Sequence, residues 1–171
     1  MLSAARPVPA TSAIGFGNRQ AVRTAMLAAA VTSLLMMVPW PLAPFFLVVW
    51  LLAAGFSAVY AYNRRTGEAL SMRSGVRLGW LTGVFCFLIT LILTVSTALA
   101  LASSGGLASL WRKQIQENAQ PGLNVEQMLE VLDSPMGLSL VVIFSLGLLF
   151  LLFTTLPMIG GALGAKVLEK E

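Results

Sequence analysis

Long apolar stretches without a charged residue are the feature that most constrains this chain. Four of them occur, over about 25–38, 45–62, 79–102 and 136–165, and no Asp, Glu, Lys, Arg or His interrupts any of them. A transmembrane helix needs about 20 mainly apolar residues to cross ~30 Å of hydrocarbon. Only 11% of the residues are charged, against about 25% in an average soluble domain. We therefore expect an integral membrane protein.

The four stretches predict an all-α fold, a bundle of four transmembrane helices. With their flanking residues, the predicted spans cover 21–40, 44–62, 78–102 and 136–165. Residues 1–20 are expected to form a flexible cytoplasmic tail, and 21–171 the membrane domain. The first stretch also resembles the apolar region of a signal peptide, so its cleavage is the alternative to its retention as a helix.

A polar insertion, residues 103–135, separates the third and fourth spans. Its apolar residues recur at helical spacing, which predicts a short amphipathic helical insertion docked on the bundle or in the headgroup layer. Ser134 and Pro135 have the residue types of an N-cap and first helical position. The last stretch is longer than a bilayer requires, so we expect it to tilt or to bend near Pro157.

Basic residues indicate the orientation. In a four-span arrangement nine of the eleven fall on one side, namely Arg6, Arg19, Arg23, Arg64, Arg65, Arg73, Arg77, Lys166 and Lys170. The positive-inside rule then places both termini in the cytoplasm. Trp40, Tyr60 and Tyr62 lie near the ends of the stretches and are expected in the interfacial aromatic belts.

Glycines predict how the helices pack. Gly75, Gly79 and Gly83 are spaced by four and share one face of the third span, while Gly160, Gly161 and Gly164 form a small-residue face on the fourth. Without a Cβ atom, such faces let two backbones approach closely in lipid. We interpret them as contacts within one bundle, with homodimerisation as the alternative.

Four arginines are candidate contacts for a lipid headgroup or an acidic partner: Arg64, Arg65, Arg73 and Arg77. Juxtamembrane basic clusters attract anionic lipids, although orientation and snorkelling also explain them. The net charge of +4 does not indicate nucleic acid, because the basic residues lie at the ends of apolar stretches. The expected partners are membrane lipids and other integral membrane subunits.

Catalytic and metal-binding chemistry has little support. The chain has no histidine, and Cys86 is its one cysteine, so we expect no catalytic residue, no cofactor and no metal. Proton relays and ion pathways usually contain intramembrane ionisable groups, which these stretches lack. The hydroxyl residues of the third and fourth spans are expected to bond to the backbone or across helices, with a substrate path as the alternative: Thr90, Thr94, Ser96, Thr97, Thr154 and Thr155.

The segment 62–68, its continuation through 75–83, and the closing segment 156–165 resemble a group of small four-span bacterial inner-membrane proteins of unknown function. Some of those proteins carry an N-terminal zinc ribbon, for which this chain lacks the cysteines. The resemblance implies the bacterial cytoplasmic membrane as the location. It implies no activity and no functional residue.

These patterns favour a non-enzymatic structural or accessory membrane protein, as a subunit of a larger membrane complex. A small oligomeric transporter or channel-like protein is the alternative. A membrane enzyme acting on lipid has support only from the basic loop and the amphipathic insertion.

Overall fold

The structure, a computed structural model, describes residues 14–37, 43–67, 70–103 and 134–168. This part of the chain is all helical, as predicted, and has four helices: α1 (Arg19–Met36), α2 (Ala43–Thr66), α3 (Met72–Ser103) and α6 (Pro135–Leu168). The predicted amphipathic insertion, most of the predicted tail and Trp40 lie outside the described residues.

Three helices are long and apolar enough to cross a membrane: Phe45–Thr66 in α2, Met72–Ala100 in α3 and Met136–Leu168 in α6. α1 is not among them, because its 18 residues include Arg19 and Arg23 at its beginning. At a rise of 1.5 Å per residue α1 is about 27 Å long. The structure thus supports a multi-pass membrane protein, and the fourth span stays a prediction.

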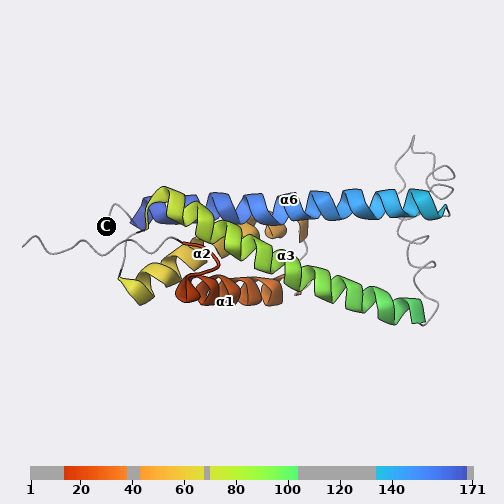
Figure 1. The fold of residues 1–171 in the computed structure, drawn as a ribbon, viewed down its shortest axis with the longest axis horizontal. Coiled ribbons are helices and arrows are strands. Elements are labelled where there is room, and N and C mark those ends of the chain that lie inside the picture. The colour runs from red at the N-terminus through yellow and green to blue at the C-terminus, as the bar shows by residue number, and fades with distance from the viewer. Residues whose placement is uncertain (1–13, 38–42, 68–69, 104–133, 169–171) are drawn as a thin grey trace, which may run out of the picture.

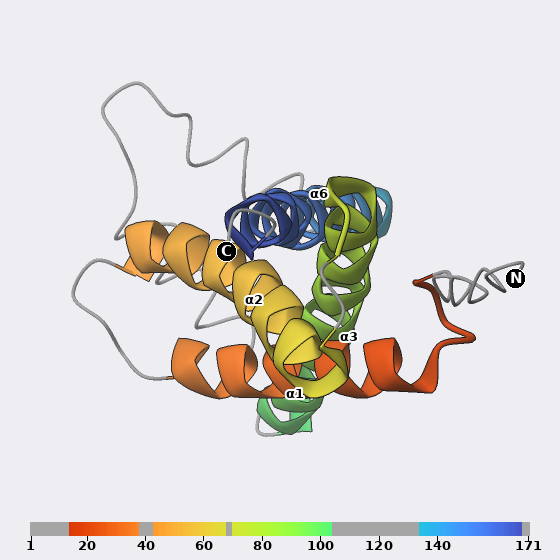
Figure 2. The ribbon, with the colours of Figure 1, turned by 90° about the vertical axis from the view of Figure 1, so that its left-hand side faces the viewer.

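α1 and α2 lie beside one half of the α3–α6 pair, and the other halves of α3 and α6 extend beyond them (Figure 1). α6 packs against α2 and α3, and α1 packs against α2 and α3 without approaching α6. α1 and α2 lie beside the C-terminal half of α6, and both cross its direction obliquely (Figures 1 and 2). α3 begins against α6 and diverges from it toward its own C-terminal end.

Local sequence signals set the helix ends. The Asn18 side chain accepts hydrogen bonds from the backbone N–H groups of Gln20 (3.1 Å) and Ala21 (3.2 Å) and so caps α1. Ser134 caps α6 by accepting from the Gly137 N–H at 2.9 Å, which confirms the predicted Ser-Pro start. α2 ends at Thr66, and the next residue, Gly67, adopts a positive φ of 69° and donates its N–H to the Asn63 carbonyl at 2.7 Å.

Tyr62 corrects one expectation from the sequence. It was expected in the interfacial belt with Tyr60, but its side chain is only 2% exposed. Its hydroxyl accepts a hydrogen bond from the Asn18 side-chain amide at 3.3 Å. Tyr62 therefore joins the end of α2 to the cap of α1, and the two helices run antiparallel from the same end of the bundle.

Candidate functional site

The closest helix contact joins α3 and α6 through glycines. A Cβ atom at Gly79 would meet the Pro157 carbonyl oxygen and lie 3.0 Å from the Met158 Cα, and one at Gly83 would lie 2.9 Å from the Thr154 Cα. A Cβ atom at Gly75 would lie 2.6 Å from the Ala165 Cβ. The two helices therefore touch backbone to backbone along this face, an approach that lipid-embedded helices use to gain van der Waals contact.

α6 makes a second contact of this kind with α2. A Cβ atom at Gly55 would meet the Pro157 carbonyl and lie 2.8 Å from the Gly161 nitrogen. One at Gly160 would meet the Leu52 carbonyl and lie 3.1 Å from the Leu52 Cα. Gly160 therefore faces α2, while Gly161 faces Gly75 and Gly79 of α3. The adjacent glycines let one helix touch two neighbours.

Gly164 and Gly55 differ from what the sequence suggested. A Cβ atom at Gly164 would meet side-chain atoms of Phe56 and Val59 at 3.3 Å, so this glycine packs against side chains of α2. The sequence analysis missed Gly55, which has no glycine four residues away to signal a contact face.

Pro157 lies at the centre of this junction and is fully buried. α6 runs unbroken through it, although a proline lacks the N–H that would bond the carbonyl four residues earlier. That carbonyl belongs to Phe153 and faces the space where a Gly83 Cβ would lie. Glycine Cα–H groups at such contacts supply weak hydrogen bonds to carbonyl oxygens. Gly83 of α3 thus offers the Phe153 carbonyl a weak donor in place of the missing N–H.

α1 is held by a small-residue face of its own, which the sequence analysis also missed. Ala21, Ala25 and Ala29 have no exposed surface, and Ser33 is buried one turn further. Their spacing by four was the available signal. Cys86 of α3 packs here, with its sulfur 4.0 Å from the Ala29 carbonyl oxygen.

Four of the six hydroxyl side chains that were expected to bond to the backbone do so within their own helix, and the Thr82 hydroxyl does the same. Each of five donates to the carbonyl four residues earlier, at 2.6–2.9 Å: Thr82, Ser96, Thr97, Thr154 and Thr155. Thr90 and Thr94 are exceptions, because neither makes a hydrogen bond in the described part of the chain. Both line a cleft between α3 and α6.

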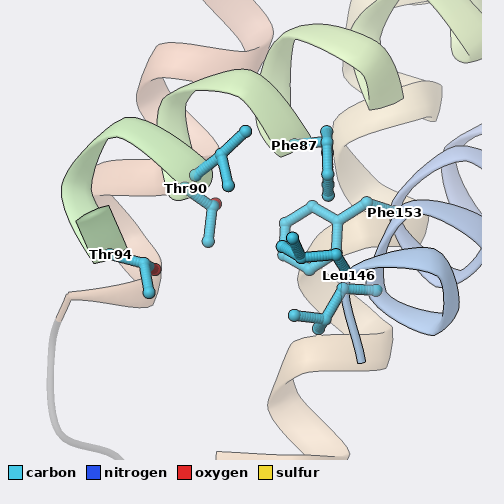
Figure 3. A pocket seen from close by; sticks show the side chains of 7 residues that line it. Phe87, Thr90, Thr94, Leu146 and Phe153 are labelled. Carbon is cyan, nitrogen blue, oxygen red and sulfur yellow. The ribbon is translucent and has the colours of Figure 1, made fainter. Parts of the chain in front are cut away.

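This α3–α6 cleft has a volume of about 40 Å³, and its other lining residues are Phe87, Leu91, Leu146, Leu149 and Phe153. Figure 3 shows Thr90 and Thr94 on α3 across from Leu146 and Phe153 of α6. The cleft begins where the glycine face of α3 ends, because the next residue at the same spacing is Phe87. The Phe87 ring meets the Phe150 ring edge to face, with centroids 5.2 Å apart, and large side chains here hold the backbones apart.

From the cleft onward, α3 and α6 continue as separate apolar helices. Among the described residues no other helix lies beside these far halves, residues 91–103 and 135–151 (Figure 1). Large apolar side chains there are exposed, as in Leu99 (72%) and Phe144 (73%).

The opposite end of the bundle carries the positive charge and is called the basic end. Arg64 and Arg65 lie in the last turn of α2, and Arg73 and Arg77 at the start of α3 are exposed. The described residues include no Asp or Glu. Three further basic residues share this end: Arg19, Arg23 and Lys166.

One of the four predicted arginines, Arg65, lines a cavity at the basic end. Arg65 does so together with Arg23, Gln20 and Thr24, and the cavity has a volume of about 380 Å³. Arg23 was counted for orientation in the sequence analysis and not as a binding residue. Its place beside Arg65 depends on the pairing of α1 with α2.

No protein-family model, curated protein or solved structure matches this chain.

Proposed function

We propose that this chain is a non-enzymatic accessory subunit of a membrane complex, and that the far halves of α3 and α6 bind a transmembrane helix of a larger partner. The observation that supports this is the contrast between the two halves. The near half, which is the half of the bundle at the basic end, is held together by backbone contacts at Gly79, Gly83 and Gly160. In the far half, α3 and α6 diverge and leave their apolar side chains exposed.

The unpaired hydroxyl groups favour a protein helix over a lipid chain in the cleft. Thr90 and Thr94 line it without a hydrogen bond among the described residues. An acyl chain offers neither donor nor acceptor, whereas polar side chains of a neighbouring helix form hydrogen bonds of this kind in membranes. The far halves are also apolar enough to stay in the bilayer while they contact a partner.

Photo-cross-linking tests this proposal. With a photoreactive amino acid at Leu149, which lines the cleft, we expect cross-links to a second membrane protein. Leu163, on the near half of α6 and 52% exposed, provides the control and should react only with lipid. Mass spectrometry of the products identifies the adducts.

The same experiment separates the accessory function from its alternative. Cross-links from Leu149 to a second copy of this chain alone would favour the small oligomeric transporter or channel-like protein. Cross-links to lipid alone, at both positions, would contradict a protein partner in the cleft.

We also propose the bacterial inner membrane as the location, with four spans and cytoplasmic termini. The clustering of basic residues at one end of all four helices supports this orientation. The exposed apolar face of α1, with Met26, Leu27 and Val31, is suited to lipid. α1 and α2 would then cross as an antiparallel hairpin.

Reporter fusions after Arg65 and at the C-terminus are expected to read cytoplasmic, and fusions at Pro41 and Asn118 to read on the opposite side. A fusion at the N-terminus is the decisive one, because α1 lies between it and Pro41, and it is expected to read cytoplasmic. An outside reading at the N-terminus, with Pro41 also outside, would mean that α1 does not cross the membrane. The four-span arrangement would then be wrong. The Arg65 and Asn118 fusions serve as the controls for each side.

A further inference from the structure

We infer a phosphate-binding site at the basic end, in the cavity between α1 and α2, where Arg23 and Arg65 bind the phosphate of an anionic phospholipid headgroup. Gln20 and Thr24 complete its described lining. This inference does not depend on the proposed partner of the α3–α6 cleft, because the two sites share no lining residue and belong to different pairs of helices.

Tertiary structure brings the two arginines together. Arg23 lies near the beginning of α1 and Arg65 in the last turn of α2. The hydrogen bond between the Asn18 and Tyr62 side chains holds these two helix ends side by side. Arg23 and Arg65 therefore line one cavity, although most of α1 and α2 lies between them in the sequence.

The guanidinium groups of Arg23 and Arg65 have N–H donors that can bind an anion. Neither Arg23 nor Arg65 makes a hydrogen bond or an ion pair in the described part of the chain, which contains no carboxylate. A guanidinium presents a planar set of N–H donors that matches the oxygens of a phosphate. The Thr24 hydroxyl donates to the Gln20 carbonyl at 2.7 Å, so its proton is already used within α1.

The volume of the cavity and the exposed apolar residues beside it favour a phospholipid headgroup over a single phosphate ion as the ligand. The cavity volume of about 380 Å³ falls within the range of small-molecule sites, about 300–1,000 Å³, and exceeds the need of one phosphate ion. Met26 and Leu27 follow Arg23 by three and four residues, so they lie on the same face one turn further along α1. Both are exposed. A lipid with its phosphate at Arg23 would lay its acyl chain along them.

The test uses the full chain in mild detergent, with lipid binding measured by native mass spectrometry. We expect phosphatidylglycerol to bind more tightly than the zwitterionic phosphatidylcholine. In the double variant Arg23→Gln/Arg65→Gln the affinity for phosphatidylglycerol should fall by more than about tenfold, because the charge-assisted hydrogen bonds from two guanidinium groups to one phosphate are lost. In the matched control Arg73→Gln/Arg77→Gln, which loses the same charge outside the cavity, the fall should be smaller than about threefold.

Equal losses in the two double variants, or no loss in either, would overturn the site, because general attraction to a basic surface would then explain the binding. Inorganic phosphate provides the second arm. If millimolar phosphate binds to the parent but not to the Arg23/Arg65 variant, while phosphatidylglycerol shows no preference over phosphatidylcholine, the ligand of the site is a soluble phosphate and the lipid is excluded. Phosphate binding that survives in this variant would place phosphate elsewhere and contradict the inference.

A conservative variant guards against a folding defect. Arg23→Lys/Arg65→Lys keeps both charges but loses the planar donor pairs. An affinity between those of the parent and the glutamine variant, with unchanged thermal unfolding, supports phosphate binding in the cavity. Full parental affinity would show that charge alone is sufficient and would contradict guanidinium recognition.

Discussion

Replacing Gly79 with leucine is expected to separate α3 from α6 and to lower the free energy of unfolding by on the order of 3 kcal/mol, as overpacking does. A Cβ atom at this position would meet the Pro157 carbonyl oxygen and the Met158 Cα. Both belong to the backbone of a continuous helix, so neither can move aside as a flexible side chain would. The measurement is thermal or denaturant-induced unfolding of the detergent-solubilised protein.

Gly147→Leu is the matched control for this prediction. Gly147 also lies inside a membrane helix, α6, but nothing lies within 4 Å of the position of its Cβ atom. This variant should unfold like the parent. If Gly79→Leu also unfolded like the parent, the backbone contact between α3 and α6 would be wrong.

The second large effect is expected at Ala29, where leucine should displace α1 and expose Cys86. Ala29 has no exposed surface, and the Cys86 sulfur lies 4.0 Å from its carbonyl oxygen. Cys86 is the one cysteine of the chain, so its reaction with a membrane-permeant maleimide reports on this contact alone. Buried groups react mainly through local opening, and we expect the labelling rate to rise at least about tenfold.

Ala53→Leu makes the same chemical change on α2 at an exposed position and should leave the labelling rate unchanged. Fast labelling of Cys86 in the parent protein would show that α1 does not cover this part of α3. The packing of α1 through its alanine face would then have to be abandoned.

The sequence by itself determined the helical membrane class and the one-sided charge. Apolar length and basic flanks are properties of each segment alone, because every backbone polar group in lipid must be satisfied within its own helix or a closed barrel. The cap at Ser134 was predictable for the same local reason. The glycine spacing in α3 likewise identified a face suited to close contact before any partner was known.

The partner of each face was decided only by tertiary structure. A helix face of small residues spaced by four can pack against any similar face. Which helix becomes its partner depends on how the helices tilt and on which large side chains keep them apart. Phe87 ends the close contact between α3 and α6, and Thr90, three residues further along, lines the cleft that opens there. The pairing of α1 with α2 buries Tyr62 and brings Arg23 to Arg65, because side-chain neighbours across helices depend on tilt and register, which no single segment encodes.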